Sequence, residues 1–303
     1  MHGHPGHSHG HDHAHAAPTL HDRRYTIAIA LNLGFVVVEA AAGFIARSTA
    51  LLSDATHNLS DVLGLALAAG AAWLAQRRGN TQRTYGFAKA TVLAALANAI
   101  VLIVACGGIL WEAVLRFQTP VETQPILVMA VAGVGVLING GTALLFLAGR
   151  KQDVNVRGAY LHMVADAGVS AAVILAGAAI WLTSWQWIDP AISIGVVALI
   201  LWGTWSLLTE SLDLTLDAAP AHIDVAAVRA YLAAQPGVTA VHDLHVWAMG
   251  ATQPALTAHL VRPNGGDDAF LDAVTHGLEH RFGIKHSTVQ IERAQRGECS
   301  DCD

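Results

Sequence analysis

The chain has 303 residues, of which 53% are hydrophobic and only 13% are charged, and its mean hydropathy is +0.45. This composition is too apolar for a soluble protein of that length, and it predicts several transmembrane helices. The net charge is −6, with the acidic excess in the C-terminal third, and nothing indicates a nucleic-acid partner. Three cysteines are too few for the disulfide framework of a secreted protein.

Residues 1–22 are predicted to form a disordered, His-rich tail. Eight of the 17 histidines lie in residues 1–21, interleaved with Gly, Ser, Asp and Pro and without apolar periodicity. These interruptions argue against a purification tag. We interpret the segment as a weak metal-collecting tail, with an inert solubilising tail as the alternative. Because a polar tail precedes the first apolar stretch, no secretory signal is predicted.

Six hydrophobic helices are predicted next, which makes residues 23–211 a membrane domain. Several reach the roughly 20 residues that are needed to cross the hydrocarbon core. Lys and Arg in the short connections fall mostly on one side, so the positive-inside rule places both termini in the cytoplasm. The cytoplasmic set is Arg23, Arg24, Arg77, Arg78, Arg83, Lys89, Arg150, Lys151 and Arg157, against Arg47 and Arg116 on the other side. The spans are expected near Tyr25–Ala46, Leu51–Leu74, Ala90–Val114, Pro125–Leu147, Val156–Trp181 and Ile188–Leu208.

Two of these spans carry the pattern His-x-x-x-Asp, as His57 with Asp61 and as His162 with Asp166. Residues i and i+4 share one face of a helix, so each pair points an imidazole and a carboxylate the same way. An ionisable group at mid-membrane depth costs about 2.5–3.5 kcal/mol and normally faces a partner or a water-filled cavity. Two His and two Asp form an N2O2 set that suits tetrahedral zinc. The duplicated pattern favours one shared metal site over two unrelated hydrogen-bonding patches.

Other polar or reactive residues also fall inside the predicted spans. Asn32, Asn98 and Asn139 are expected to make packing hydrogen bonds, and Cys106 is expected to be a small core residue. Glu39, because of its charge, is a candidate for a proton path.

The segment ALLSDATHNLSD at residues 50–61, followed by HMVAD at residues 162–166 within six predicted spans, resembles the cation diffusion facilitator family of metal/proton antiporters. The resemblance covers about residues 23–295. It implies that His57, Asp61, His162 and Asp166 bind the transported ion. Their His-Asp/His-Asp set resembles the zinc-preferring branch, with cadmium or cobalt as further candidate ions. The connection from Arg77 to Tyr85 has no His or Asp, so the additional loop site of some members is not expected.

Residues 212–303 are predicted to form a soluble domain of order αββαβ. The order matches the small cytoplasmic domain of the resembling family, which dimerises. The expected fold is therefore a membrane bundle of six transmembrane helices with a C-terminal α+β, metallochaperone-like domain, assembled as a homodimer. The elements are expected at Ala221–Gln235, Ala240–Ala248, Ala255–Val261, Asp267–Phe282 and Thr288–Glu292.

The resemblance places cytoplasmic zinc ligands at His242, His259 and Glu292. Cys299 and Cys302 form a Cys-x-x-Cys pair, which is typical of a metal clip or a redox pair. The redox alternative requires a βαβ context that a chain terminus lacks, so a metal clip is favoured, with its missing ligands from the His-rich tail. The other histidines of the domain are expected to be ordinary surface or interface residues: His222, His245, His276, His280 and His286.

Lys89 opens the third span, and Asp217 lies where the sixth span leads into the soluble domain. The resemblance implies that the two form an ion pair at the dimer hinge. In the alternative interpretation Lys89 is only a positive-inside anchor and Asp217 only a linker residue.

The sequence thus predicts an antiporter, not an enzyme, that exports Zn²⁺ from the cytosol against protons. It would be an integral protein among the lipids of a bacterial plasma membrane, a location that the Ala-rich composition favours. An intramembrane metalloenzyme is one alternative, but the protease pattern His-Glu-x-x-His does not occur. A membrane-anchored metal sensor is the other, and a ligand set shared by two separate spans argues against it.

Overall fold

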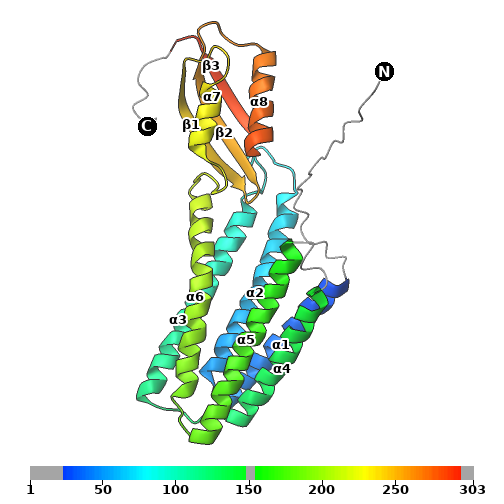
Figure 1. Ribbon diagram of the computed structural model, residues 1–303, viewed down its shortest axis with the longest axis vertical. Helices are drawn as coiled ribbons and strands as arrows, with labels where there is room; N and C mark the ends of the chain where they lie inside the picture. The colour runs from blue at the N-terminus through cyan, green and yellow to red at the C-terminus, as the bar shows by residue number, and fades with distance from the viewer. Residues whose placement is uncertain (1–22, 148–153, 295–303) are drawn as a thin grey trace, which may run out of the picture.

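The computed structural model describes residues 23–147 and 154–294, and it has a long helical bundle with a smaller domain at one end (Figure 1). The helices of the bundle agree closely with the expected spans, except that α6 continues past Leu208. They are α1 (Arg23–Ala46), α2 (Thr49–Ala75), α3 (Ala90–Gln118), α4 (Pro125–Phe146), α5 (Val154–Thr183) and α6 (Ile188–Thr215).

Among the described residues, five helices, α2 to α6, are long and apolar enough to cross a membrane, and α1 contributes a shorter apolar stretch, Asn32–Ala46. Large apolar side chains such as Val104, Leu137 and Trp202 are exposed on its outside. Such a surface is unfavourable in water and typical of contact with lipid. Cys106 is fully buried in a cluster with Leu102 and Val197, which confirms its prediction as a core residue.

A buried polar cluster joins α2, α3 and α6 at the end of the bundle away from the C-terminal domain. The Asp189 carboxylate accepts hydrogen bonds from the Thr49 backbone N–H and hydroxyl, each at 2.7 Å, and from the Ser48 hydroxyl. Arg116 on α3 lies 3.7 Å from the same carboxylate. Ser48 also caps α2 by accepting from the Leu51 N–H, so this cluster satisfies donors that the start of a helix leaves free.

The C-terminal domain has the predicted order αββαβ: α7 (Val225–Ala233), β1 (Ala240–Gly250), β2 (Gln253–Val261), α8 (Asp268–Phe282) and β3 (His286–Glu292). Strand β2 is central, antiparallel to β1 and parallel to β3. Both helices pack on the sheet, and Val228, Leu256, Leu260 and Leu278 are fully buried between the two layers. Asp224 caps α7, and Gly283 ends α8 with a φ of 72°.

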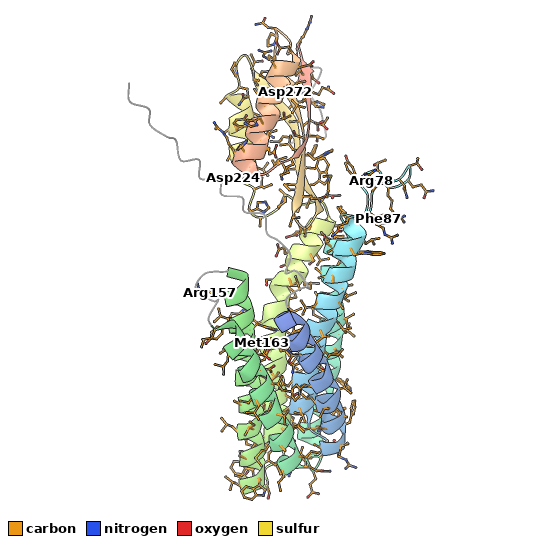
Figure 2. The ribbon with its side chains drawn as sticks, turned by 90° about the vertical axis from the view of Figure 1, so that its right-hand side faces the viewer. Arg78, Phe87, Arg157, Met163, Asp224 and Asp272 are labelled. Atoms are coloured by element: carbon orange, nitrogen blue, oxygen red, sulfur yellow. The ribbon has the colours of Figure 1, made fainter. Side chains whose placement is uncertain are left out.

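The C-terminal domain follows α6 in the chain, and it lies beside the connection between α2 and α3, where Arg78 and Phe87 are found (Figure 2). The Ala251 N–H, in the turn between β1 and β2, donates to the Thr91 hydroxyl at 3.2 Å. The Tyr85 ring meets the His286 ring edge-on, with their centroids 5.5 Å apart. The two domains therefore touch through side chains and backbone as well as through the chain that links them.

Candidate metal centres

The four residues of the two His-x-x-x-Asp pairs come together between α2 and α5. Nε2 of His57 lies 3.8 Å from Asp61 and 3.4 Å from Asp166, and Nε2 of His162 lies 3.2 Å from Asp61 and 3.6 Å from Asp166. Imidazole and carboxylate thus alternate around a ring, with two contacts within a helix and two between helices. Ligand atoms at tetrahedral positions about 2.0–2.1 Å from a zinc ion are about 3.3 Å apart. The atoms of His57, Asp61 and Asp166 all lie within 4.8 Å of one another, whereas the His57 and His162 rings are 6.0 Å apart, so the group of four is more open than a tetrahedral site on the His162 side.

The burial of this group is uneven, and part of its hydrogen-bonding capacity is unused. The side chain of Asp166 is 3% exposed, whereas that of His162 is 41% exposed. Oδ2 of Asp61 has the contact with His162 described above, and Nδ1 of His57, the ring nitrogen that does not face the carboxylates, is buried without a hydrogen-bond partner. Carboxylates held close together away from water are costly, so a divalent cation bound among the four side chains would offset that cost. The donor set and its spacing fit a divalent ion of the zinc type.

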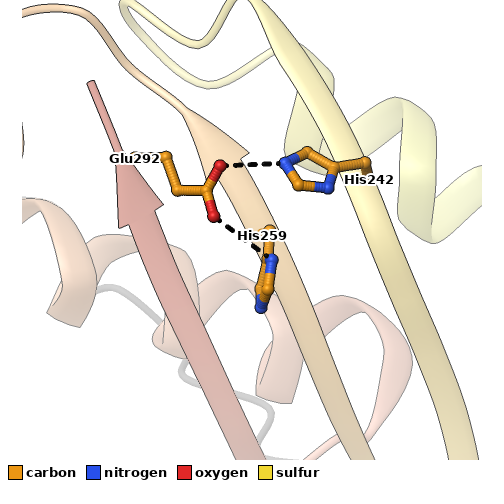
Figure 3. A group of neighbouring side chains, drawn as sticks. All are labelled: His242, His259 and Glu292. Atoms are coloured by element: carbon orange, nitrogen blue, oxygen red, sulfur yellow. Dashed lines mark hydrogen bonds and ion pairs between the residues drawn. The ribbon is translucent and has the colours of Figure 1, made fainter. Parts of the chain in front are cut away.

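A second group lies on the sheet of the C-terminal domain and is drawn in Figure 3. Nε2 of His242 lies 3.1 Å from one carboxylate oxygen of Glu292, and Nδ1 of His259 lies 3.4 Å from the other. The register explains this proximity, because His242 pairs with His259 across β1 and β2, and Glu292 pairs with Val261 on β2. Three strands thus contribute one potential ligand each.

Local interactions keep the Glu292 carboxylate ionised. Burial by itself would raise its pKa, but hydrogen bonds from Gln290 and His242 and the neighbouring His242 and His259 rings outweigh that effect, so the pKa is lowered from its ordinary value. An anionic carboxylate between two imidazoles is a suitable arrangement for a zinc ion. The residue triplet thus fits a metal, as the intramembrane group does.

The sequence reasoning missed Asp243, which extends the cluster on the sheet. Its carboxylate lies 2.9 Å from Nε2 of His245 and 3.3 Å from Nε2 of His259. The ladder is irregular between His242 and His245, and Asp243 there has a φ of 51°, which turns its side chain out of the strand alternation. The spacing His-Asp-x-His is a possible signal in the sequence, but a regular strand would put Asp243 on the opposite face from His242.

The structure pairs Lys89 with Asp217, whose Nζ and Oδ1 atoms lie 2.5 Å apart. Both side chains are exposed, at 40% and 58%, so the pair is at a solvated surface. Cys299, Cys302 and the His-rich tail lie outside the described residues.

Comparison with known proteins agrees with this architecture. The cation efflux transmembrane domain family matches residues 25–214, and the family described as the cytoplasmic domain of cation efflux proteins matches residues 220–294. The metal cation efflux system protein CzcD of Cupriavidus metallidurans is 35% identical over 95% of this chain and 90% of its own length. The zinc transporter ZitB of Escherichia coli is 37% identical over 94% of this chain and 92% of its own.

A third relative is the cadmium, cobalt and zinc/H(+)-K(+) antiporter of Bacillus subtilis, 33% identical over 88% of this chain and 87% of its own. Among solved structures, the metal-bound C-terminal domain of CzcD is 36% identical over 23% of this chain and 99% of its own, with a TM-score of 0.20. The two family matches, together with relatives that align over most of the chain, lead to one conclusion. The chain is an integral membrane protein that belongs to the cation efflux family of metal transporters.

Proposed function

We propose that the protein exports zinc from the cytosol by exchanging it for protons at His57, Asp61, His162 and Asp166. The observation that carries the proposal is the alternating ring of two imidazoles and two carboxylates on α2 and α5. The relatives are named as zinc transporters or as transporters of cadmium, cobalt and zinc, which makes cadmium and cobalt the further candidate ions.

Proton coupling follows from the chemistry of these ligands. His and Asp bind a metal only when deprotonated, so protons and zinc compete for the same atoms. When the site faces the cytosol, where protons are scarce, it takes up zinc. When it faces the more acidic side, protons displace the zinc. One site in two conformations thus gives an exchange cycle, and the Bacillus relative is named as an antiporter.

The orientation follows from the distribution of Lys and Arg, which puts both termini and the C-terminal domain in the cytoplasm. The proposal is supported by the position of Arg78 and Arg157, which both lie at the end of the bundle nearer that domain (Figure 2). We assign the protein to a bacterial plasma membrane. The C-terminal domain would hold the homodimer together and bind regulatory zinc at His242, His259 and Glu292, with Cys299 and Cys302 as a further metal clip.

Zinc flux into sealed proteoliposomes, with an acidic lumen and the purified chain in the membrane, tests the proposal. The wild-type protein is expected to accumulate zinc, and collapsing the pH gradient is expected to remove most of the accumulation. A matched control is Asp213→Ala, which removes an exposed carboxylate at the end of α6 and should leave flux unchanged. A wild-type protein that binds zinc without moving it would instead support a membrane-anchored sensor.

A further inference from the structure

Two acidic side chains are fully buried beside the proposed intramembrane metal ligands, and neither is itself one of those ligands. Glu39 lies on α1 and Asp54 lies on α2, one helical turn before His57. Asn58, one helical turn after Asp54 on the same face of α2, donates a hydrogen bond to Glu39, which places the two carboxyl groups beside each other. Since α2 begins at the end of the bundle away from the C-terminal domain, Asp54 lies between the metal ligands and that end.

The remaining partners of this pair are neutral. Asn58 donates its side-chain N–H to Oε2 of Glu39 at 3.0 Å, and Ser170 on α5 donates its hydroxyl to Oδ2 of Asp54 at 2.9 Å. The other oxygen of each carboxyl group, Oε1 of Glu39 and Oδ1 of Asp54, is buried and has no donor. Each carboxyl therefore has one oxygen satisfied by the protein and one that is not.

The charges around the pair do not neutralise two carboxylates. Helix α2 contributes His57 and α5 contributes Asp166, both of which interact electrostatically with Asp54, and Asp166 also acts on Glu39. Helix α4, which packs against α1, has no titratable side chain in its sequence. Two adjacent buried carboxyl groups without a paired cation cannot both be ionised. A single proton between Oε1 of Glu39 and Oδ1 of Asp54 would give both free oxygens a partner.

We propose that the Glu39–Asp54 pair is a dedicated proton site, and that zinc binding to the neighbouring ligands expels its proton. The inference rests on the proposed function and adds a carrier that is separate from the metal ligands. A doubly charged ion one turn away lowers the energy of the ionised pair, because charges interact strongly at low dielectric. The proton leaves the carboxyl group for water on the side to which the site is open. It returns when the zinc departs.

Proton release on zinc binding tests this directly with the full-length protein in detergent. Zinc titrations by calorimetry in buffers of different ionisation enthalpy give the number of protons released per zinc. Glu39→Gln keeps the size of the side chain and an oxygen that accepts from Asn58. Asp54→Asn likewise keeps its size and an oxygen that accepts from Ser170. Each variant is expected to bind zinc and to release about one proton fewer than the wild type. Glu112→Gln, at a carboxylate paired with Arg116, is the control and should release the wild-type number.

An unchanged proton count in both variants would overturn the inference. So would a zinc flux in Glu39→Gln proteoliposomes that depends on the pH gradient as steeply as in the wild type. If the wild type itself shows no pH-driven flux, the proposed function fails instead.

Infrared difference spectra of the wild type, with and without zinc, need no variant and remain decisive if the variants do not fold. The carbonyl band of a buried protonated carboxylic acid is expected to disappear on zinc addition. No such band in the zinc-free protein would contradict the proposal.

Discussion

Nε2 of His162 on α5 lies 3.2 Å from Oδ2 of Asp61 on α2, a contact between residues 101 positions apart in the chain. The equivalent contact of His57 with Asp166 closes the ring from the other side. Because each helix supplies one His and one Asp, neither helix alone can complete four ligands. A small movement of α2 relative to α5 would open the ring, so in the proposed mechanism ion release would accompany helix movement.

Replacing one imidazole by a carboxylate should change which ions the site accepts. His57→Asp keeps four ligands but makes the set richer in oxygen, which suits harder ions such as manganese. The ratio of manganese flux to zinc flux in proteoliposomes is expected to rise about tenfold, equivalent to about 1.4 kcal/mol. The same ratio in wild type and variant would argue that His57 is not a ligand.

Much of this site could be predicted because the i to i+4 spacing within a helix determines which side chains share a face. That rule connects His57 with Asp61 and His162 with Asp166, and the duplicated pattern connects the two pairs. The contact of Glu39 with Asp54 was not predicted, because helix spacing says nothing about which face of α1 meets α2. Glu39 alone could be singled out, from the cost of its charge in a membrane.

In the C-terminal domain, too, features that depend on neighbouring residues could be predicted, whereas contacts between residues distant in the chain could not. Strand patterns and turn residues predicted the element order αββαβ, which the structure confirms. The irregularity at Asp243 depends on how β1 pairs with β2, so strict alternation gave no reason to place Asp243 beside His259. The buried contacts of Asp189 likewise depend on three helices meeting at one end of the bundle.

Removing the ligands on the sheet should lower the zinc stoichiometry of the full-length protein. The double variant His242→Ala with His259→Ala is expected to bind about one zinc fewer per chain, because Glu292 alone holds a metal weakly. Calorimetry measures the stoichiometry, with exposed His222→Ala as the control. Binding at this site should weaken on acidification, since protons compete for the imidazoles while the lowered pKa keeps Glu292 ionised. Equal stoichiometry in double variant and wild type would reject the site.

The Lys89–Asp217 ion pair should contribute little to stability. Exposed pairs contribute about 0–1 kcal/mol, because solvent screens them and ordering two side chains costs entropy. A double-mutant cycle of Lys89→Ala and Asp217→Ala, scored by denaturation in detergent, is therefore expected to give a coupling below about 1 kcal/mol. A larger coupling, together with loss of the dimer in both variants, would indicate a buried network at the dimer hinge.

The cluster around Asp189 should matter more for stability. Asp189→Ala removes the acceptor of Ser48 and Thr49 and the partner of Arg116, which leaves buried donors unsatisfied. The expected loss is about 1–3 kcal/mol, seen as a lower denaturation midpoint in detergent. Glu112→Ala breaks a more exposed contact of the same arginine and should cost about 0–1 kcal/mol. Equal midpoints for the two variants would show that burial of the Asp189 cluster adds nothing.

The most direct test of the central assignment is the initial rate of zinc uptake by acid-loaded proteoliposomes that contain Asp166→Asn. This change preserves the size of the least exposed of the four side chains but removes its charge, so the zinc site loses an anionic ligand. We expect uptake to fall to the rate of protein-free vesicles while the denaturation midpoint stays close to that of the wild type. Uptake at the wild-type rate would contradict the assignment of zinc transport to His57, Asp61, His162 and Asp166.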